Sequence, residues 1–130
     1  MTEFTKLTSV ADIVEAQLGQ VLPADAHVRE LLDFAGAWDQ VEPLLIHCYA
    51  GVSRSTAAAF IAACALAPKR DEGEIARALR AASPTATPNA RLVTLADAAL
   101  DRGGRMVAAI AAIGRGAECF KGEPFALALA

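Results

Sequence analysis

The stretch from His47 to Ser55 holds side chains whose types and spacing suit chemistry on a phosphate group. Cys48 supplies a thiol, which becomes a strong nucleophile once it loses its proton. Arg54 follows with a planar guanidinium that can bind two phosphate oxygens at once. Gly51, between them, lets the backbone curl so that successive N–H groups point inward around an anion. The set predicts phosphoryl transfer to a thiol.

The segments on either side of this stretch would position it. Leu44, Leu45 and Ile46 form a short apolar run that predicts a buried strand. Residues 55–66 are apolar nearly all round, which predicts a buried helix. The loop would then end at a helix N-terminus, where unpaired N–H groups and the helix dipole attract an anion and favour the thiolate of Cys48. Ser55 can donate a hydrogen bond to that thiolate.

The same residues resemble the signature of the protein tyrosine and dual-specificity phosphatases, His-Cys-x-x-Gly-x-x-Arg-Ser/Thr. His47, Cys48, Gly51, Arg54 and Ser55 match every fixed position. Residues 11–125, including the run from Ala81 to Asn89, look like a bacterial branch of this superfamily. The resemblance implies that Cys48 forms a phosphocysteine, that Arg54 and the N–H groups of residues 49–54 bind phosphate, and that His47 tunes the thiolate. The residues expected to line the substrate are Tyr49, Ala50, Gly51, Val52, Ser53 and Arg54.

The family also needs a general acid, an aspartate on a loop upstream of the signature. A carboxylic acid protonates the departing oxygen, and its carboxylate can later activate water. Asp12 is the candidate here, because the run from Ala11 to Glu15 looks like the acid loop of small dual-specificity members. An ordinary loop carboxylate is the alternative interpretation of Asp12, and Glu15 is the second candidate acid.

The expected fold class is α/β, a small and mostly parallel sheet flanked by about five helices in one domain over residues 1–130. Residues 1–10 are a weak strand candidate, and residues 116–130 are expected to be a surface tail. The strands that precede the acid loop in the family are missing, so an exposed sheet edge and self-association are expected. The expected helices span residues 24–38, 55–66, 88–100 and 105–113, with a further helix beginning after Asp71.

Composition narrows the function classes. The net charge is −3 and no run of Lys or Arg occurs, which argues against nucleic-acid binding. No metal-ligand spacing is present, so neither a metal nor another cofactor is expected. The three cysteines, Cys48, Cys64 and Cys119, form no disulfide framework and favour the cytoplasm; the role of Cys119 stays open. No membrane-spanning run is found.

The substrate expected is a phosphorylated protein or a small phosphate monoester. The loop positions 49, 50, 52 and 53 hold no basic side chain, which argues against a multiply phosphorylated lipid. Two other interpretations stay open. One is a phosphate-binding module without catalysis, with the loop on an incomplete fold. The other is an arsenate reductase of the phosphatase-like type, which would need a second cysteine within reach of Cys48.

Overall fold

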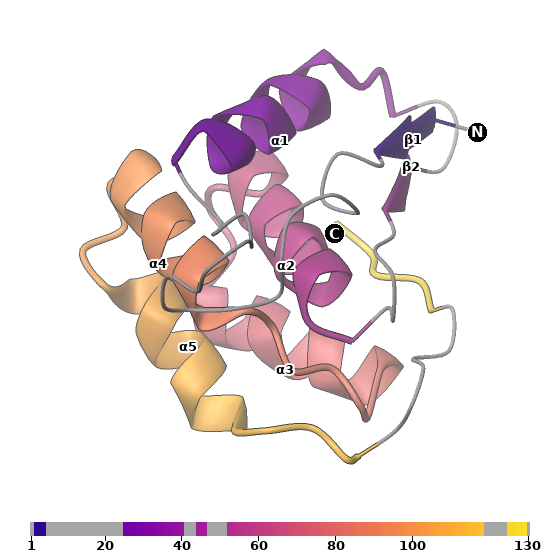
Figure 1. The fold of residues 1–130 in the computed structure, drawn as a ribbon, viewed down its shortest axis with the longest axis vertical. Coiled ribbons are helices and arrows are strands. Elements are labelled where there is room, and N and C mark those ends of the chain that lie inside the picture. Colours follow the sequence, from indigo (N-terminus) through magenta and orange to yellow (C-terminus); the bar gives the residue numbers. More distant parts are fainter. Residues whose placement is uncertain (1, 5–24, 41–43, 47–51, 119–124, 130) are drawn as a thin grey trace, which may run out of the picture.

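The computed structural model describes residues 2–4, 25–40, 44–46, 52–118 and 125–129. In chain order the elements are β1 (Thr2–Phe4), α1 (Asp25–Ala37), β2 (Leu44–Ile46), α2 (Arg54–Leu66), α3 (Glu72–Ala82), α4 (Ala90–Ala99) and α5 (Arg105–Ile113). Helix α2 is central: it packs against α1, α3 and α4, while α5 closes over α3 and α4 (Figure 1).

Helix α2 is buried on almost every side because its sequence is apolar nearly all round, as the sequence predicts. Phe60 is the largest side chain that the core encloses completely, and Ile61 lies beside it in the chain. Burying an aliphatic or aromatic side chain of this size contributes ~1.5–3 kcal/mol to folding. The other buried apolar residues of α2 are Ala57, Ala58, Ala62, Ala63 and Cys64. These small side chains let the neighbouring helices approach closely.

The surrounding helices each turn one apolar stripe toward α2. In α1 the buried residues are Val28, Leu31 and Ala35, which recur at helical spacing. In α3 they include Ile75 and Leu79. The expected helix over residues 24–38 is thereby confirmed as α1, and the expected last helix is confirmed as α5 with the same bounds, Arg105–Ile113.

Helices α3 and α4 each begin at a short polar side chain that caps them. Asp71 caps α3, and its carboxylate accepts a hydrogen bond from the Glu74 N–H at 3.0 Å. Helix α4 differs from the sequence prediction, which began this helix at residue 88. The cap is Asn89, whose side-chain oxygen accepts from the Leu92 N–H at 3.0 Å. The Thr87 hydroxyl donates to the Thr85 carbonyl at 3.2 Å, and α4 begins at Ala90, two residues beyond the expected start.

The expected α/β fold class is wrong. In the part of the chain that the structure describes, the core cluster consists of residues from the five helices and the turn before α4. The strands are limited to β1 and β2, three residues each, which pair in parallel. A pair of this size offers no face on which helices could pack. Alanine-rich segments with high helix propensity pack on one another instead.

Residues 125–129 lie against the helices rather than apart from them. Phe125, Leu127 and Leu129 are half-buried and pack on the core cluster. Arg70 donates a hydrogen bond from Nη1 to the Ala128 carbonyl at 2.9 Å. Residues 125–129 are thus held against the helical core and the turn between α2 and α3. The alternation of apolar residues in this segment is that of an extended chain with one side on the core.

Candidate functional site

The structure describes the second half of the signature. Val52 and Ser53 are half-buried, and Arg54 and Ser55 are buried in the first turn of α2. The other predicted site residues lie outside the described residues: Asp12, Glu15, His47, Cys48, Tyr49, Ala50 and Gly51. The structure therefore describes residues 52–55, which we call the loop exit, and the residues that contact them.

Arg54 opens α2, and only 8 % of its surface is exposed. A guanidinium keeps its charge at any physiological pH, and here it stands at the positive end of a helix dipole. Ser55 follows with 7 % exposure. The two signature residues that are expected to bind phosphate and to assist the thiolate thus share the first turn of a helix that the core encloses. Such a turn has little freedom to move relative to the rest of the domain.

The carbonyl groups at the loop exit are anchored by the protein. The Val52 carbonyl accepts hydrogen bonds from the Thr87 N–H at 3.0 Å and from the Thr56 hydroxyl. The Ser53 carbonyl accepts from the Asn89 N–H at 3.1 Å. In a trans peptide the C=O and N–H bonds point in opposite directions. The N–H groups of Ser53 and Arg54 therefore point away from the residues that anchor these carbonyls.

The two anchoring residues outside α2, Thr87 and Asn89, belong to one stretch, residues 84–89, which we call the bracing segment. Helix α3 holds this segment through Arg80, whose Nη2 donates to the Ala86 carbonyl at 2.9 Å. The same guanidinium donates to the carbonyls of Ile113 at 2.7 Å and Gly114 at 2.8 Å, at the end of α5. Arg80 thereby ties α3, the bracing segment and the end of α5 together at one point.

A second stretch, residues 114–118, runs along the bracing segment, and we call it the strap. The Gly116 N–H donates to the Thr87 hydroxyl at 3.1 Å, and the Ala117 N–H donates to the Pro84 carbonyl at 3.0 Å. A Cβ on Gly116 would lie 2.5 Å from the carbonyl carbon and oxygen of Thr85. Only glycine permits so close an approach of two backbones. The strap is thus fitted against the segment that anchors the loop exit.

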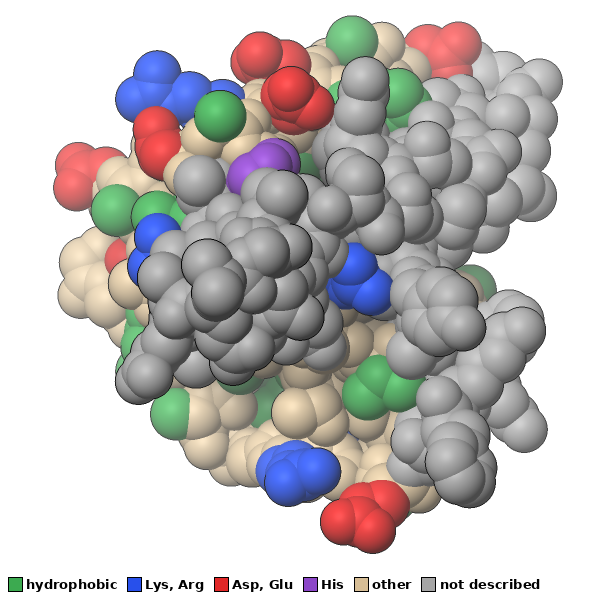
Figure 2. Space-filling view, viewed as in Figure 1, with side chains coloured by type: hydrophobic (Ala, Val, Ile, Leu, Met, Phe, Trp, Pro, Cys, Tyr) green, Lys and Arg blue, Asp and Glu red, His purple; other side chains and the backbone are tan. Residues whose placement is uncertain are grey.

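A hollow of about 900 Å³ lies where the loop exit, the bracing segment and the strap meet. Its walls are Val52, Ser53, Thr87, Pro88, Ile110, Ala111 and the five residues of the strap. Most of these side chains are small or apolar. Two exposed charges, on Arg115 and Glu118, have opposite signs. On the face drawn in Figure 2, the Lys and Arg side chains of the described residues form separate groups and no continuous basic patch.

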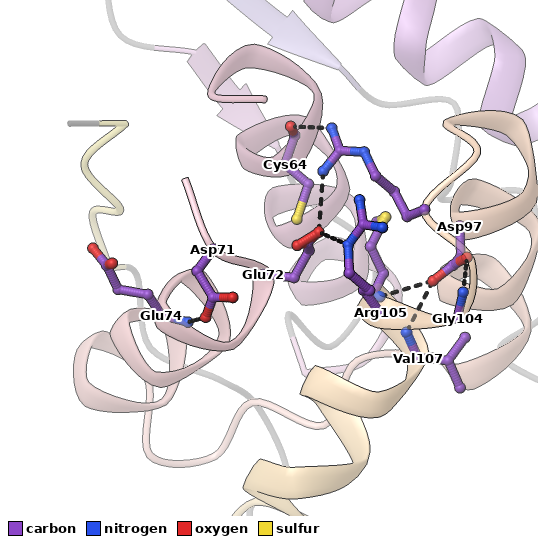
Figure 3. Close-up of polar contacts among 10 residues, drawn as sticks. Cys64, Asp71, Glu72, Glu74, Asp97, Gly104, Arg105 and Val107 are labelled. Carbon is purple, nitrogen blue, oxygen red and sulfur yellow. Dashed lines mark hydrogen bonds and ion pairs between the residues drawn. The ribbon is translucent and has the colours of Figure 1, made fainter. Parts of the chain in front are cut away.

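A mostly buried polar cluster fastens the start of α5, the end of this helix away from the hollow (Figure 3). The Asp97 carboxylate accepts from the N–H groups of Gly104 and Met106, both at 2.8 Å, at the start of α5. Glu72 accepts from Arg105 Nε at 2.8 Å and lies 3.7 Å from Arg102 Nη1. The hydrogen bond from Arg105 holds the pKa of Glu72 below its usual value. The cluster fixes the helix whose far end forms a wall of the hollow.

Cys64 is the second thiol that the sequence offered for chemistry, and it is inert here. Its side chain is fully buried in α2, and this desolvation raises the pKa of the thiol to about 12. A thiol with so high a pKa stays protonated and is a poor nucleophile. Cys64 therefore does not suit the second cysteine that an arsenate reductase would need.

Sequence patterns did not identify Arg80, Thr87 or Gly116 as parts of the site. Their contacts join residues 29 and 33 positions apart, as in the pairs Thr87–Gly116 and Arg80–Ile113. One signal was present: the run from Ala81 to Asn89 is part of the family resemblance, although no chemistry required it there. The glycine at 116 carries no local turn pattern that would mark a close approach.

No protein-family model matches this chain, and neither a curated protein nor a solved structure matches it. Among the described residues, no group of three His, Cys, Asp or Glu side chains could hold a metal ion. None of the helices in the described ranges is long and apolar enough to cross a membrane.

Proposed function

We propose that this protein hydrolyses phosphate monoesters through a cysteinyl-phosphate intermediate, as a protein tyrosine or dual-specificity phosphatase. The observation that carries the proposal is the exit of the signature. Arg54 and Ser55 occupy the first turn of a buried helix, and the carbonyls of Val52 and Ser53 are anchored on one side. Peptide N–H groups that point to the other side are what a phosphate cradle requires.

The proposed reaction has two steps. The Cys48 thiolate attacks phosphorus, the bond to the ester oxygen breaks, and Asp12 gives its proton to that oxygen. Water then attacks the phosphocysteine while the Asp12 carboxylate takes a proton from it. The phosphorus–sulfur bond breaks, inorganic phosphate leaves, and the Ser55 hydroxyl stabilises the returning thiolate. Arg54 binds two oxygens of the phosphoryl group in both steps, and no cofactor is needed for the balance.

The site would work in the cytoplasm, since Cys48 must remain a thiol and glutathione keeps thiols reduced there. The proposed substrates are phosphorylated proteins or small phosphate monoesters. A phosphate-binding module without catalysis is the second candidate. One observation favours it: the described part of the chain is a helical domain and lacks the larger sheet that the family resemblance implied.

Turnover of para-nitrophenyl phosphate separates the two candidates, because this ester has a good leaving group and needs little help from an acid. We expect Cys48→Ser to abolish turnover while vanadate still binds. Arg54→Lys should lose most of both turnover and vanadate binding, since lysine offers no planar fork. Cys64→Ala is the matched control, because it removes a buried thiol away from the loop exit, and it should keep turnover. Substantial hydrolysis by Cys48→Ser would refute the mechanism.

A further inference from the structure

Thr56 carries a hydroxyl group at the point where the signature passes into the apolar run of α2, and neither proposed chemical step uses it. Its side chain is fully buried. The hydroxyl donates to the Val52 carbonyl and also lies 3.2 Å from the Ser53 carbonyl oxygen. A hydroxyl has one proton to donate, and the shorter contact goes to Val52. A buried side chain of α2 therefore holds the backbone of the loop exit.

This hydrogen bond differs from the usual one made by a threonine in a helix. Such a hydroxyl commonly donates to the carbonyl four residues earlier, within the same helix. Thr94 does so in α4, where its hydroxyl donates to the Ala90 carbonyl at 2.8 Å on an exposed face. Thr56 has the same spacing to its acceptor, but Val52 lies before the start of α2. The Thr56 hydroxyl thus holds a peptide of the loop rather than one of the helix.

The Val52 carbonyl is held from two directions. The Thr56 hydroxyl reaches it from α2, and the Thr87 N–H reaches it from the bracing segment at 3.0 Å. A carbonyl oxygen has two lone pairs, so both can be used at once. Because the peptide unit is planar and trans, fixing this oxygen also fixes the Ser53 N–H on the opposite side of the unit. With one donor removed, the peptide plane could turn about the hydrogen bond that is left.

We propose that Thr56 is a positioning residue for anion binding: its hydroxyl holds the Val52 carbonyl so that the Ser53 N–H points at the phosphate group in the loop. This role rests on the proposed function and deepens it, because it assigns part of the anion affinity to a side chain that does not touch the anion. Successive N–H groups bind an anion when they converge on it. A turned peptide would offer the anion a carbonyl oxygen, which repels it.

Two variants of Thr56 separate positioning from packing. Thr56→Val keeps the shape of the side chain and removes the hydroxyl, whereas Thr56→Ser keeps the hydroxyl and removes the methyl group. We expect Thr56→Val to bind vanadate about tenfold more weakly than wild type, an effect of the size of one lost hydrogen bond. Thr56→Ser should bind vanadate as tightly as wild type, even though the loss of a buried methyl group lowers its midpoint in urea unfolding.

Thr94→Val is the matched control, because it removes a hydrogen bond of the same kind and spacing from an exposed helix face. It should leave vanadate affinity unchanged. Isothermal titration calorimetry on the full chain measures the affinity, and circular dichroism checks that each variant is folded. Thr56→Ala compared with Thr56→Ser is a second pair that differs only in the hydroxyl, so the test does not depend on the folding of Thr56→Val.

The outcomes separate this role from the proposed function. A wild-type chain that hydrolyses para-nitrophenyl phosphate, with unchanged vanadate affinity in Thr56→Val, would overturn the positioning role and leave the phosphatase standing. Equal weakening in Thr56→Val and Thr56→Ser would also overturn it, because the affinity would then follow packing. A chain that binds vanadate without turnover, and loses affinity only where the hydroxyl is removed, would overturn the enzyme and support the positioning role. A wild-type chain that does not bind vanadate would overturn both.

Discussion

Gly116→Ala should push the strap away from the bracing segment, and the size of this effect follows from the distances between the new Cβ and its neighbours. The new Cβ would lie 2.5 Å from the Thr85 carbonyl group and 2.6 Å from the Ala86 oxygen, whereas ordinary contact begins at 3.4 Å. The strap and the bracing segment would have to separate by 0.9 Å, the difference between 3.4 and 2.5 Å. The atoms in the way belong to backbone, so no side-chain rotation relieves the clash.

The energy expected from this separation is that of overpacking a well-packed site, a loss of ~1–3 kcal/mol in the free energy of unfolding. Gly36→Ala is the matched control. Gly36 lies in α1 with nothing within 4 Å of the Cβ position, and its φ is in the ordinary range. There the same change should stabilise by ~0.4–1 kcal/mol, because alanine restricts the unfolded chain.

Urea unfolding monitored by circular dichroism measures both variants, with the slope of the transition as a check on two-state behaviour. We expect the free energy of unfolding to fall in Gly116→Ala and to rise in Gly36→Ala. Vanadate affinity is a second measurement. The Gly116 N–H donates to the Thr87 hydroxyl, and the Thr87 N–H donates to the Val52 carbonyl, so the affinity should fall by about tenfold in Gly116→Ala and stay unchanged in Gly36→Ala. Equal stability of the two variants, or unchanged vanadate affinity in Gly116→Ala, would refute the role assigned to the strap.

Three further predictions test the scaffold and the acid. Asp97→Ala leaves buried N–H groups at the start of α5 without their acceptor, so it should lower the free energy of unfolding by ~2–3 kcal/mol. Asp33→Ala, at an exposed position, should lower it by ~0.5 kcal/mol or less, and urea unfolding measures both variants. The pKa of Glu72 is lowered on folding, so its contribution to the free energy of unfolding is present above its unfolded pKa and is lost as pH falls through its folded pKa. Glu72→Gln should therefore have a lower free energy of unfolding than wild type at pH ~7, and this free energy should fall less steeply below pH ~5. Asp12→Asn should slow hydrolysis of phosphotyrosine by ~10²–10⁴-fold and that of para-nitrophenyl phosphate much less; equal slowing of both would shift the acid assignment to Glu15.

The helices could be predicted where the signal is local. Helix α2 follows from an apolar run that ends before Pro68, and α3 follows from Asp71 capping the Glu74 N–H. The Glu74 carboxylate accepts a hydrogen bond from Arg70 Nε at 3.1 Å. The sequence predicts that α4 begins at residue 88, whereas the helix begins at Ala90 with Asn89 as its cap and Thr87 two residues before that cap. Both residue types are good caps, and long-range contacts to Gly116 and Val52 decided between them.

The predicted fold class, α/β, is wrong for a different reason. The apolar run Leu44–Ile46 predicts a buried strand, and the family resemblance implies a small, mostly parallel sheet around it. A run of three apolar residues says nothing about how many strands lie beside it. The described partner of β2 is β1, at Thr2–Phe4. The self-association expected from an open sheet edge stays a prediction, which light scattering at micromolar concentration would test.

The proposed phosphate-binding loop would depend on local features of the structure, and a helical scaffold can supply these. The loop needs a helix start that does not move, and the core around Phe60 gives α2 that stability. The loop also needs its carbonyl groups to point away from the phosphate. The N–H groups of Thr87 and Asn89 donate hydrogen bonds to the carbonyls of Val52 and Ser53. In the described residues, both demands are met by packing between helices and by one braced turn. The sheet expected from the resemblance would contribute position only, so its absence from the described part leaves the proposed chemistry of Arg54 unaffected.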